Sequence, residues 1–325
     1  MSGFIELGGV MFAARRGLPI PSVIAFGLTY QLGALFQNPM ELTGRQYRGM
    51  VAVAAAAACA SFWDFRLLWI SLLLLGAGLQ GLREEAVRRA PVGTLQKRIA
   101  RIAGFSVAGW LNPALVIASS LSIILIAAVL RRWPNQADQT TRPVRRPNLS
   151  LFACVMVLHQ MHYFAYCYAL PILFLRVHGL NPVSAALAFA IGWISYSFAP
   201  SVLARVPTLT VVVAGHVGVS AMLLFAASNL HNLPMLLAAW FASGFGGGTV
   251  FGIRRLAVEW RTGDTKATLD MWENVGHVLG VLLAICLTLV ASRVDILFLA
   301  AAGLASAVAS ILAVAGYFRW GRFWG

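Results

Sequence analysis

Long apolar stretches recur along the whole chain and constrain its fold more than any other feature. They run over about 14 to 28 residues each and are separated by Gly, Pro and charged residues. A bilayer core about 30 Å thick needs about 20 apolar residues in a helix to cross it. The runs are continuous rather than alternating, which excludes a transmembrane β-barrel. The sequence therefore predicts an all-α polytopic membrane protein, with about 10–12 transmembrane helices.

The composition excludes several other classes of protein. Apolar residues make up 59% of the chain and charged residues only 11%, whereas a soluble domain has about 25% charged residues. The mean hydropathy is +0.78. These values exclude an ordinary soluble enzyme, a disordered chain and a secreted disulfide scaffold. The four cysteines lie inside apolar runs and form no CxxC pair, so we expect packing residues rather than disulfides or zinc ligands.

The expected apolar spans divide into two halves. The first half, 1–130, is an N-terminal helical bundle, and 149–325 is a C-terminal bundle. Between them, 131–148 is a basic linker with three prolines. The expected spans are 4–14 (too short to cross), 20–37, 49–62, 65–82, 102–130, 150–174, 183–203, 207–228, 233–253, 271–291 and 295–317.

Basic residues are distributed unevenly between the two predicted sides of the membrane. The net charge is +14, and cytoplasmic loops of membrane proteins accumulate Lys and Arg. We explain the positive charge by basic cytoplasmic loops rather than by nucleic-acid binding, and we expect no nucleic-acid partner. If 102–130 crosses twice, broken at Asn112-Pro113, all but five of the 25 basic residues lie inside. We therefore expect two short crossings there, a cytoplasmic linker, and a bacterial inner (plasma) membrane location.

The two halves resemble each other in the order of their features. One constant offset places Ala86-Val87 on Ala257-Val258 and Gly109 on Gly280. Each aligned segment has an apolar span, a basic loop and a Gly-containing span, which is the signature of an internal repeat. A full span precedes Gly179, but only a short one precedes Gly17. Either the start codon is assigned late, or the first helix is truncated.

Several motifs resemble those of the major facilitator superfamily. Gly44, Arg45 and Arg48 fit that family's loop between its second and third helices, although its usual aspartate is replaced. Other segments resemble the family's glycine-containing helices: Gly76-Ala77-Gly78, Gly104 to Pro113, Gly244 to Gly248, and Gly276 to Gly280. The resemblance covers nearly the whole chain and implies an atypical member.

The resemblance implies a secondary transporter in which two bundles rock around a central cavity. Members of the family use no cofactor and perform no covalent chemistry, and the fold alone leaves the substrate open. The chain also lacks HExxH and GxSxG motifs, so we expect no enzyme. Glu41, Arg45 and Arg48 are expected to form a cytoplasmic conformational latch, as in the resembling family; simple surface charge is the alternative.

One candidate cavity face lies on the first helix of the second half. His159, His162, Tyr163 and Tyr166 share one helical face, about one turn apart. Imidazoles can carry protons near neutral pH or ligate a soft transition metal, and tyrosines can hydrogen-bond a polar solute. Aromatic packing is the alternative. The expected substrate and proton cavity also includes Trp240, and no metal site is assigned.

A second candidate group begins the span at 271–291. Glu273 and His277 are i,i+4 neighbours, and Asp270 lies one turn earlier. A carboxylate beside an imidazole can form a proton relay. The alternative is that these acids favour the helix dipole and pair with Arg254 or Arg261.

Two functions of different classes follow. The preferred one is a secondary active transporter of a small polar or chelating solute, working by alternating access and coupled to protons. The alternative is a membrane scaffold or assembly factor with a transporter-like fold, which would have a membrane-protein partner. The lipid bilayer is a partner in either case.

Overall fold

The structure is a computed structural model that describes residues 2–37, 44–77, 94–132, 149–203, 206, 208–291 and 293–321. Within these ranges every regular element is a helix. The chain forms two compact units. Unit 1 comprises Met1–Pro143 with Leu180–Leu187, and unit 2 comprises Val144–Gly179 with Ala188–Gly325.

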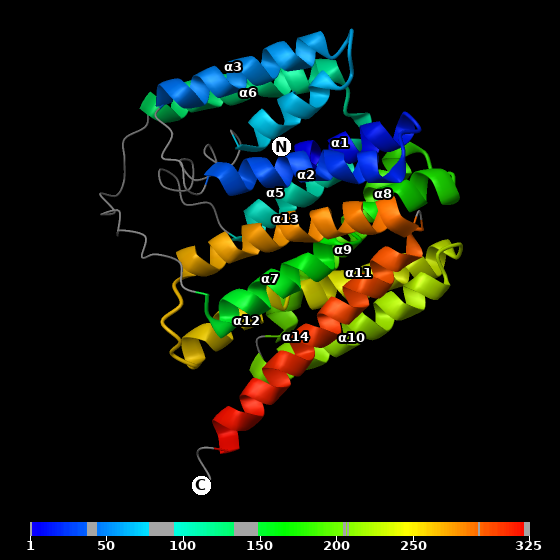
Figure 1. The fold of residues 1–325 in the computed structure, drawn as a ribbon. Helices are drawn as coiled ribbons and strands as arrows, with labels where there is room; N and C mark the ends of the chain where they lie inside the picture. The colour runs from blue at the N-terminus through cyan, green and yellow to red at the C-terminus, as the bar shows by residue number, and fades with distance from the viewer. Residues whose placement is uncertain are drawn as a thin grey trace. The chain divides into compact units, whose positions relative to one another are not determined.

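Unit 1 is built from helices of the first half of the chain. The first helix packs against α2, α5 and η1, and α3 lies beside α6 (Figure 1). A further apolar helix covers Leu67–Ala77. The labelled elements are α1 (Ser2–Arg15), α2 (Ile20–Gln37), α3 (Gly44–Ala60), α5 (Thr94–Ser106), η1 (Ala108–Trp110) and α6 (Pro113–Arg132).

Unit 2 contains longer helices. In it, α7 packs against α13 and α14, and α10 packs against α14, α11 and α12 (Figure 1). The first residues of α9 belong to unit 1. The elements are α7 (Leu151–Phe164), α8 (Ala169–Ile172), η2 (Leu173–Val177), α9 (Pro182–Leu203), α10 (Thr208–Ser228), α11 (Leu233–Gly247), α12 (Val250–Glu259), α13 (Lys266–Ala291) and α14 (Asp295–Gly321).

Asparagine side chains cap the first turns of three helices. The Oδ1 atoms of Asn112, Asn181 and Asn232 accept hydrogen bonds from backbone N–H groups three residues later, at 3.0, 2.9 and 3.2 Å. A proline follows each asparagine within two residues, where its missing N–H costs nothing. The helix break expected at Asn112-Pro113 is therefore present, because this pair begins α6.

Two expected spans contain a break that the prediction did not include. The span 150–174 is divided after Phe164, where a turn separates α7 from α8. Pro171 lacks an N–H and its ring crowds the carbonyl of Cys167, so an α-helix cannot continue undisturbed through this region. The span 233–253 is divided after Gly247, within the glycine-rich segment. There α11 gives way to α12.

Five described helical segments are long and apolar enough to cross a membrane, and one of them, Leu233–Glu259, comprises α11 and α12. All five lie in the second half of the chain. Shorter apolar helices cover Gly49–Ala60, Leu67–Ala77 and Pro113–Leu125. The candidate spans are Pro182–Ser201, Thr208–Ser228, Leu233–Glu259, Thr268–Ala291 and Asp295–Arg319.

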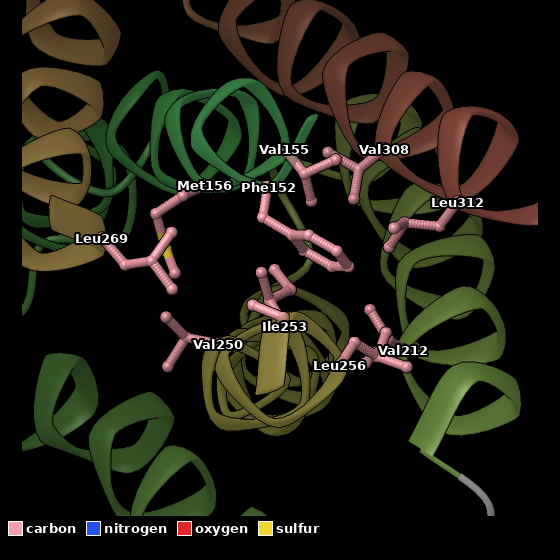
Figure 2. Packing of buried hydrophobic residues seen from close by; sticks show 11 residues of the cluster. Phe152, Val155, Met156, Val212, Val250, Ile253, Leu256, Leu269, Val308 and Leu312 are labelled. Atoms are coloured by element: carbon pink, nitrogen blue, oxygen red, sulfur yellow. The ribbon is translucent and has the colours of Figure 1, made fainter. Parts of the chain in front are cut away.

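An apolar cluster joins five helices of unit 2 (Figure 2). Phe152 of α7 lies between side chains of α12 and α14, and Met156 faces Leu269 of α13. Ile253 of α12 lies beneath the Phe152 ring. Because lipid is as apolar as these side chains, the cluster stabilises the unit through close van der Waals packing. It fixes α7, the helix that carries the candidate histidines.

Candidate functional site

Three buried histidines meet between α7 and α10. His159 and His162 come from α7, and His216 comes from α10; each is at most 1% exposed. Their ring centroids are 5.0 to 5.6 Å apart. The Nδ1 atom of His159 lies 2.8 Å from Nε2 of His216, and one nitrogen from each ring lies within 4.8 Å of the others. The two predicted histidines are thus together, with a third added.

The predicted tyrosines and tryptophan form an aromatic group with residues of α9. The Tyr163 ring lies 5.5 Å from the Trp240 ring and 5.9 Å from the Trp193 ring. The Tyr166 ring lies 5.9 Å from Trp240 at 84°, an edge-to-face geometry. Tyr163, Tyr166 and Trp240 are therefore in mutual contact, although they come from separate segments of the chain.

Polar contacts fix the orientation of this aromatic group. The Tyr166 and Ser243 hydroxyls form a hydrogen bond, and Trp240 Nε1 donates to the carbonyl of Phe189 at 2.8 Å. Glycine at 192 leaves room for the indole, because a Cβ there would lie 2.2 Å from Trp240 Cε2. The polar atoms of these rings thus have partners within a closely packed interior.

The second predicted group lies on α13 and is joined by an arginine of α12. Arg254 pairs with Asp270, at 2.6 Å, and with Glu273. His277 Nε2 lies 3.9 Å from Glu273 Oε1, and the His277 ring lies 4.3 Å from the Phe164 ring. Glu273 therefore lies between one permanent cation and one titratable imidazole.

The predicted latch falls largely outside the described part of the chain. Glu41 lies outside the described residues. The backbone of Arg45 and Arg48 belongs to the first turns of α3, but their side chains are not described. The first two residues of the predicted linker, 131–148, end α6 at Arg132. The rest of the linker lies outside the described residues.

Unit 1 contains a buried charged pair that the sequence analysis did not identify. Glu6 of α1 is 2% exposed, and its Oε2 atom lies 2.8 Å from Arg101 Nη2 on α5. Gln31 of α2 donates to Glu6 Oε1 at 3.3 Å. The expected spans 65–82 and 102–130 left Arg101 in the segment between them, whereas α5 begins at Thr94. This helix carries Arg101 beside α1.

Comparison with known proteins gives matches only at the level of structure. No family model and no curated protein matches the sequence. A mutant of the nucleoside transporter NupG is 13% identical, with a TM-score of 0.66 over 96% of this chain and 97% of that one. The human organic anion transporter MFSD10 is 15% identical, with a TM-score of 0.55 over 94% and 89%. The Escherichia coli fucose:proton symporter FucP is 10% identical, with a TM-score of 0.50 over 96% and 95%.

Because the sequence identities are low, these likenesses establish the fold alone. The chain has a major-facilitator-type transporter fold. The predicted all-α polytopic membrane architecture is confirmed. The apolar spans and the fold support an integral membrane protein, and the three similar structures named above are those of transporters.

His216 and Ser243 belong to the candidate site but were not predicted from the sequence. His216 is the only histidine in the apolar helix α10, and an ionisable residue inside an apolar span is itself a signal of function. Ser243 carried no such signal, because serines are common in membrane helices. Its partner Tyr166 lies 77 positions away in the sequence.

Proposed function

We propose that the chain is a secondary active transporter that moves a small polar or chelating solute by alternating access, coupled to protons. The similar structures are transporters of nucleosides, of organic anions and of fucose with protons. Their solutes are small and polar, which supports the same class of solute here.

One observation carries the proposal: polar side chains gather inside spans that are otherwise apolar. His159, His162 and His216 are buried together. Ionisable groups inside a membrane are costly, and in transporters they mark substrate and proton pathways. Imidazole can bind and release a proton, which supports proton coupling through this cluster. The adjoining Tyr163, Tyr166 and Trp240 would complete the substrate and proton cavity.

Glu273 and His277 are the second proposed proton-coupling pair. Protonation of His277 would place a second cation beside Glu273, which already pairs with Arg254. The protonated imidazole would compete with Arg254 for the Glu273 carboxylate. The ion pair between Arg254 and Glu273 would then weaken, and the contact between α12 and α13 would loosen. This gives a route from proton binding to helix movement.

The proposed location is a bacterial inner membrane with the basic loops and the linker in the cytoplasm. The excess of Lys and Arg in those loops supports this orientation. The proposed latch of Glu41, Arg45 and Arg48 would then lie on the cytoplasmic side.

Uptake into proteoliposomes tests the proposal. The purified chain is reconstituted and screened with nucleosides, hexoses, small organic anions and metal chelates, with and without an imposed pH gradient. We expect uptake of one class, accelerated by the gradient. His162→Gln should reduce this uptake at least tenfold, because it removes a titratable ring from the cluster. It should leave the unfolding temperature nearly unchanged, because His162 makes no hydrogen bond to any described residue.

His231→Gln is the matched control, because His231 is exposed in the turn between α10 and α11. It should transport at the wild-type rate. Gradient-independent uptake would overturn proton coupling, and wild-type uptake by His162→Gln would remove this residue from the cavity. A chain that transports none of the solutes but co-purifies with a fixed membrane-protein partner would favour the scaffold function.

A further inference from the structure

The histidine cluster has a nitrogen arrangement that proton transfer alone does not require. His159 and His162 lie one turn apart on α7, and His216 faces them from α10. One nitrogen of each ring lies within 4.8 Å of the other two. All three side chains are buried, so bulk water does not separate them.

The hydrogen bonds of His216 determine which of its nitrogens can bind an ion. Its Nδ1 atom lies 2.7 Å from the carbonyl oxygen of Val212. A carbonyl only accepts, so Nδ1 carries the proton and Nε2 of the neutral ring keeps its lone pair. A histidine that ligates a metal commonly donates its other N–H to a backbone carbonyl in this way. This Nε2 atom faces His159 Nδ1 at 2.8 Å, from which it accepts a hydrogen bond.

His162 supplies the second independent observation. It is 0% exposed, and neither ring nitrogen has a hydrogen-bond partner in the described part of the chain. A buried polar group without a partner is costly and calls for an explanation. The His162 ring lies 5.1 Å from the His159 ring and 5.6 Å from the His216 ring. A ligand bound by all three rings would therefore give His162 a polar partner.

The geometry points to a binding site for one divalent transition-metal ion, of the Zn²⁺ type, formed by His159, His162 and His216. Imidazole nitrogens suit zinc, copper, nickel and iron, whereas Mg²⁺ and Ca²⁺ require oxygen ligands. Three histidines leave the fourth tetrahedral position open to water or to an anion. The proposal concerns ion binding alone, so it goes beyond the proposed function and does not depend on it.

Binding requires only a small rearrangement of the three rings. Zinc–nitrogen bonds of about 2.0–2.1 Å place tetrahedral ligand nitrogens about 3.3 Å apart. The facing nitrogens of His159 and His216 therefore separate slightly from 2.8 Å, and nitrogen separations as long as 4.8 Å shorten by side-chain rotation. The proton between His159 Nδ1 and His216 Nε2 moves to His159 Nε2, so both facing nitrogens present lone pairs to the ion. No net charge other than that of the ion enters the span.

Cobalt binding by the purified chain tests the site without any transport measurement. The protein carries a histidine-free affinity tag, is stripped with a chelator in detergent, and is titrated with Co²⁺ under visible spectroscopy. We expect one Co²⁺ per chain, intense absorption bands typical of a four-coordinate ion, and displacement by Zn²⁺ but not by Mg²⁺. His216→Gln and His162→Gln should each weaken binding by more than the 10–100-fold cost of losing an outer-shell partner.

His231→Gln is again the control and should bind Co²⁺ as the wild type does. His162→Gln breaks no hydrogen bond to a described residue, so it remains informative if His216→Gln fails to fold. The proposal is overturned if the wild type binds no Co²⁺. It is also overturned if His162→Gln binds as tightly as the wild type. Either result leaves solute uptake, and therefore the proposed function, untouched.

Discussion

The hydrogen bond between Tyr166 and Ser243 shows how one polar contact orients the aromatic group. Both residues are buried, and the bond joins the turn after α7 to α11. Hydrogen bonds between membrane helices are worth about 0.6 kcal/mol on average and at most about 1.7. We expect Ser243→Ala to lower the free energy of unfolding by about 1 kcal/mol. Unfolding in mixed detergent micelles measures this change.

Tyr166→Phe is the matched variant, because it removes the other hydroxyl and leaves the ring in place. The double variant should cost no more than either single variant, since one bond is lost in all three. Additive losses would contradict the bond, because they would mean that each hydroxyl has a separate partner.

At the residue scale, the sequence predicted the kinds of side chain in the site better than it predicted which residues belong to the site. His159 and His162 could be paired because helical spacing places them on one face. His216 could not be assigned to them, because nothing local relates residues 57 positions apart. Glu6 was not selected as a site residue for the same reason. Its partner Arg101 lies 95 positions away.

At the element scale, two glycines let α13 approach α7 closely. A Cβ on Gly276 would lie 2.7 Å from the carbonyl oxygen of Val157, and one on Gly280 would lie 2.8 Å from that of Met161. Both obstacles are backbone atoms, so a side chain would force the helices apart. We expect Gly280→Val to cost about 1–3 kcal/mol, the usual cost of overpacking. Unfolding in detergent measures it.

Gly303 of α14 offers the control, since nothing lies within 4 Å of a Cβ built there. Gly303→Val should leave the free energy of unfolding within about 0.5 kcal/mol of the wild type. If the two variants are equally stable, the close approach of α13 to α7 is wrong.

The existence of most helices could be predicted, but their ends could not. Continuous apolar runs identify a buried helix, and the Asn112-Pro113 break was read from residue types alone. By contrast, α5 and α13 begin at Thr94 and Lys266, within segments whose charge suggested loops. Such segments form helices because tertiary packing overrides a polar composition, as the contact of Arg101 with Glu6 shows.

At the scale of the whole molecule, hydropathy was sufficient to predict the class of fold. A bilayer permits few architectures, since every backbone polar group must be paired internally. A chain of continuous apolar spans is therefore restricted to helices. The transporter resemblance then rested on glycines and on a degraded loop motif. Pairing of helices within each unit had no such signal, because lipid-facing and protein-facing surfaces are equally apolar.

The orientation of the whole molecule in the membrane is the last prediction. The charge distribution predicts that the linker, 131–148, lies in the cytoplasm and that the turn between α10 and α11 lies on the opposite side. In a chain whose four cysteines are replaced, Ala137→Cys should resist a membrane-impermeant thiol reagent applied to intact cells and react after lysis. His231→Cys in the same background should react before lysis, since His231 is exposed. Labelling of Ala137→Cys from outside would reverse the orientation of the basic loops. It would also remove the reason for two crossings within 102–130, because a single crossing would move the linker to the outer side.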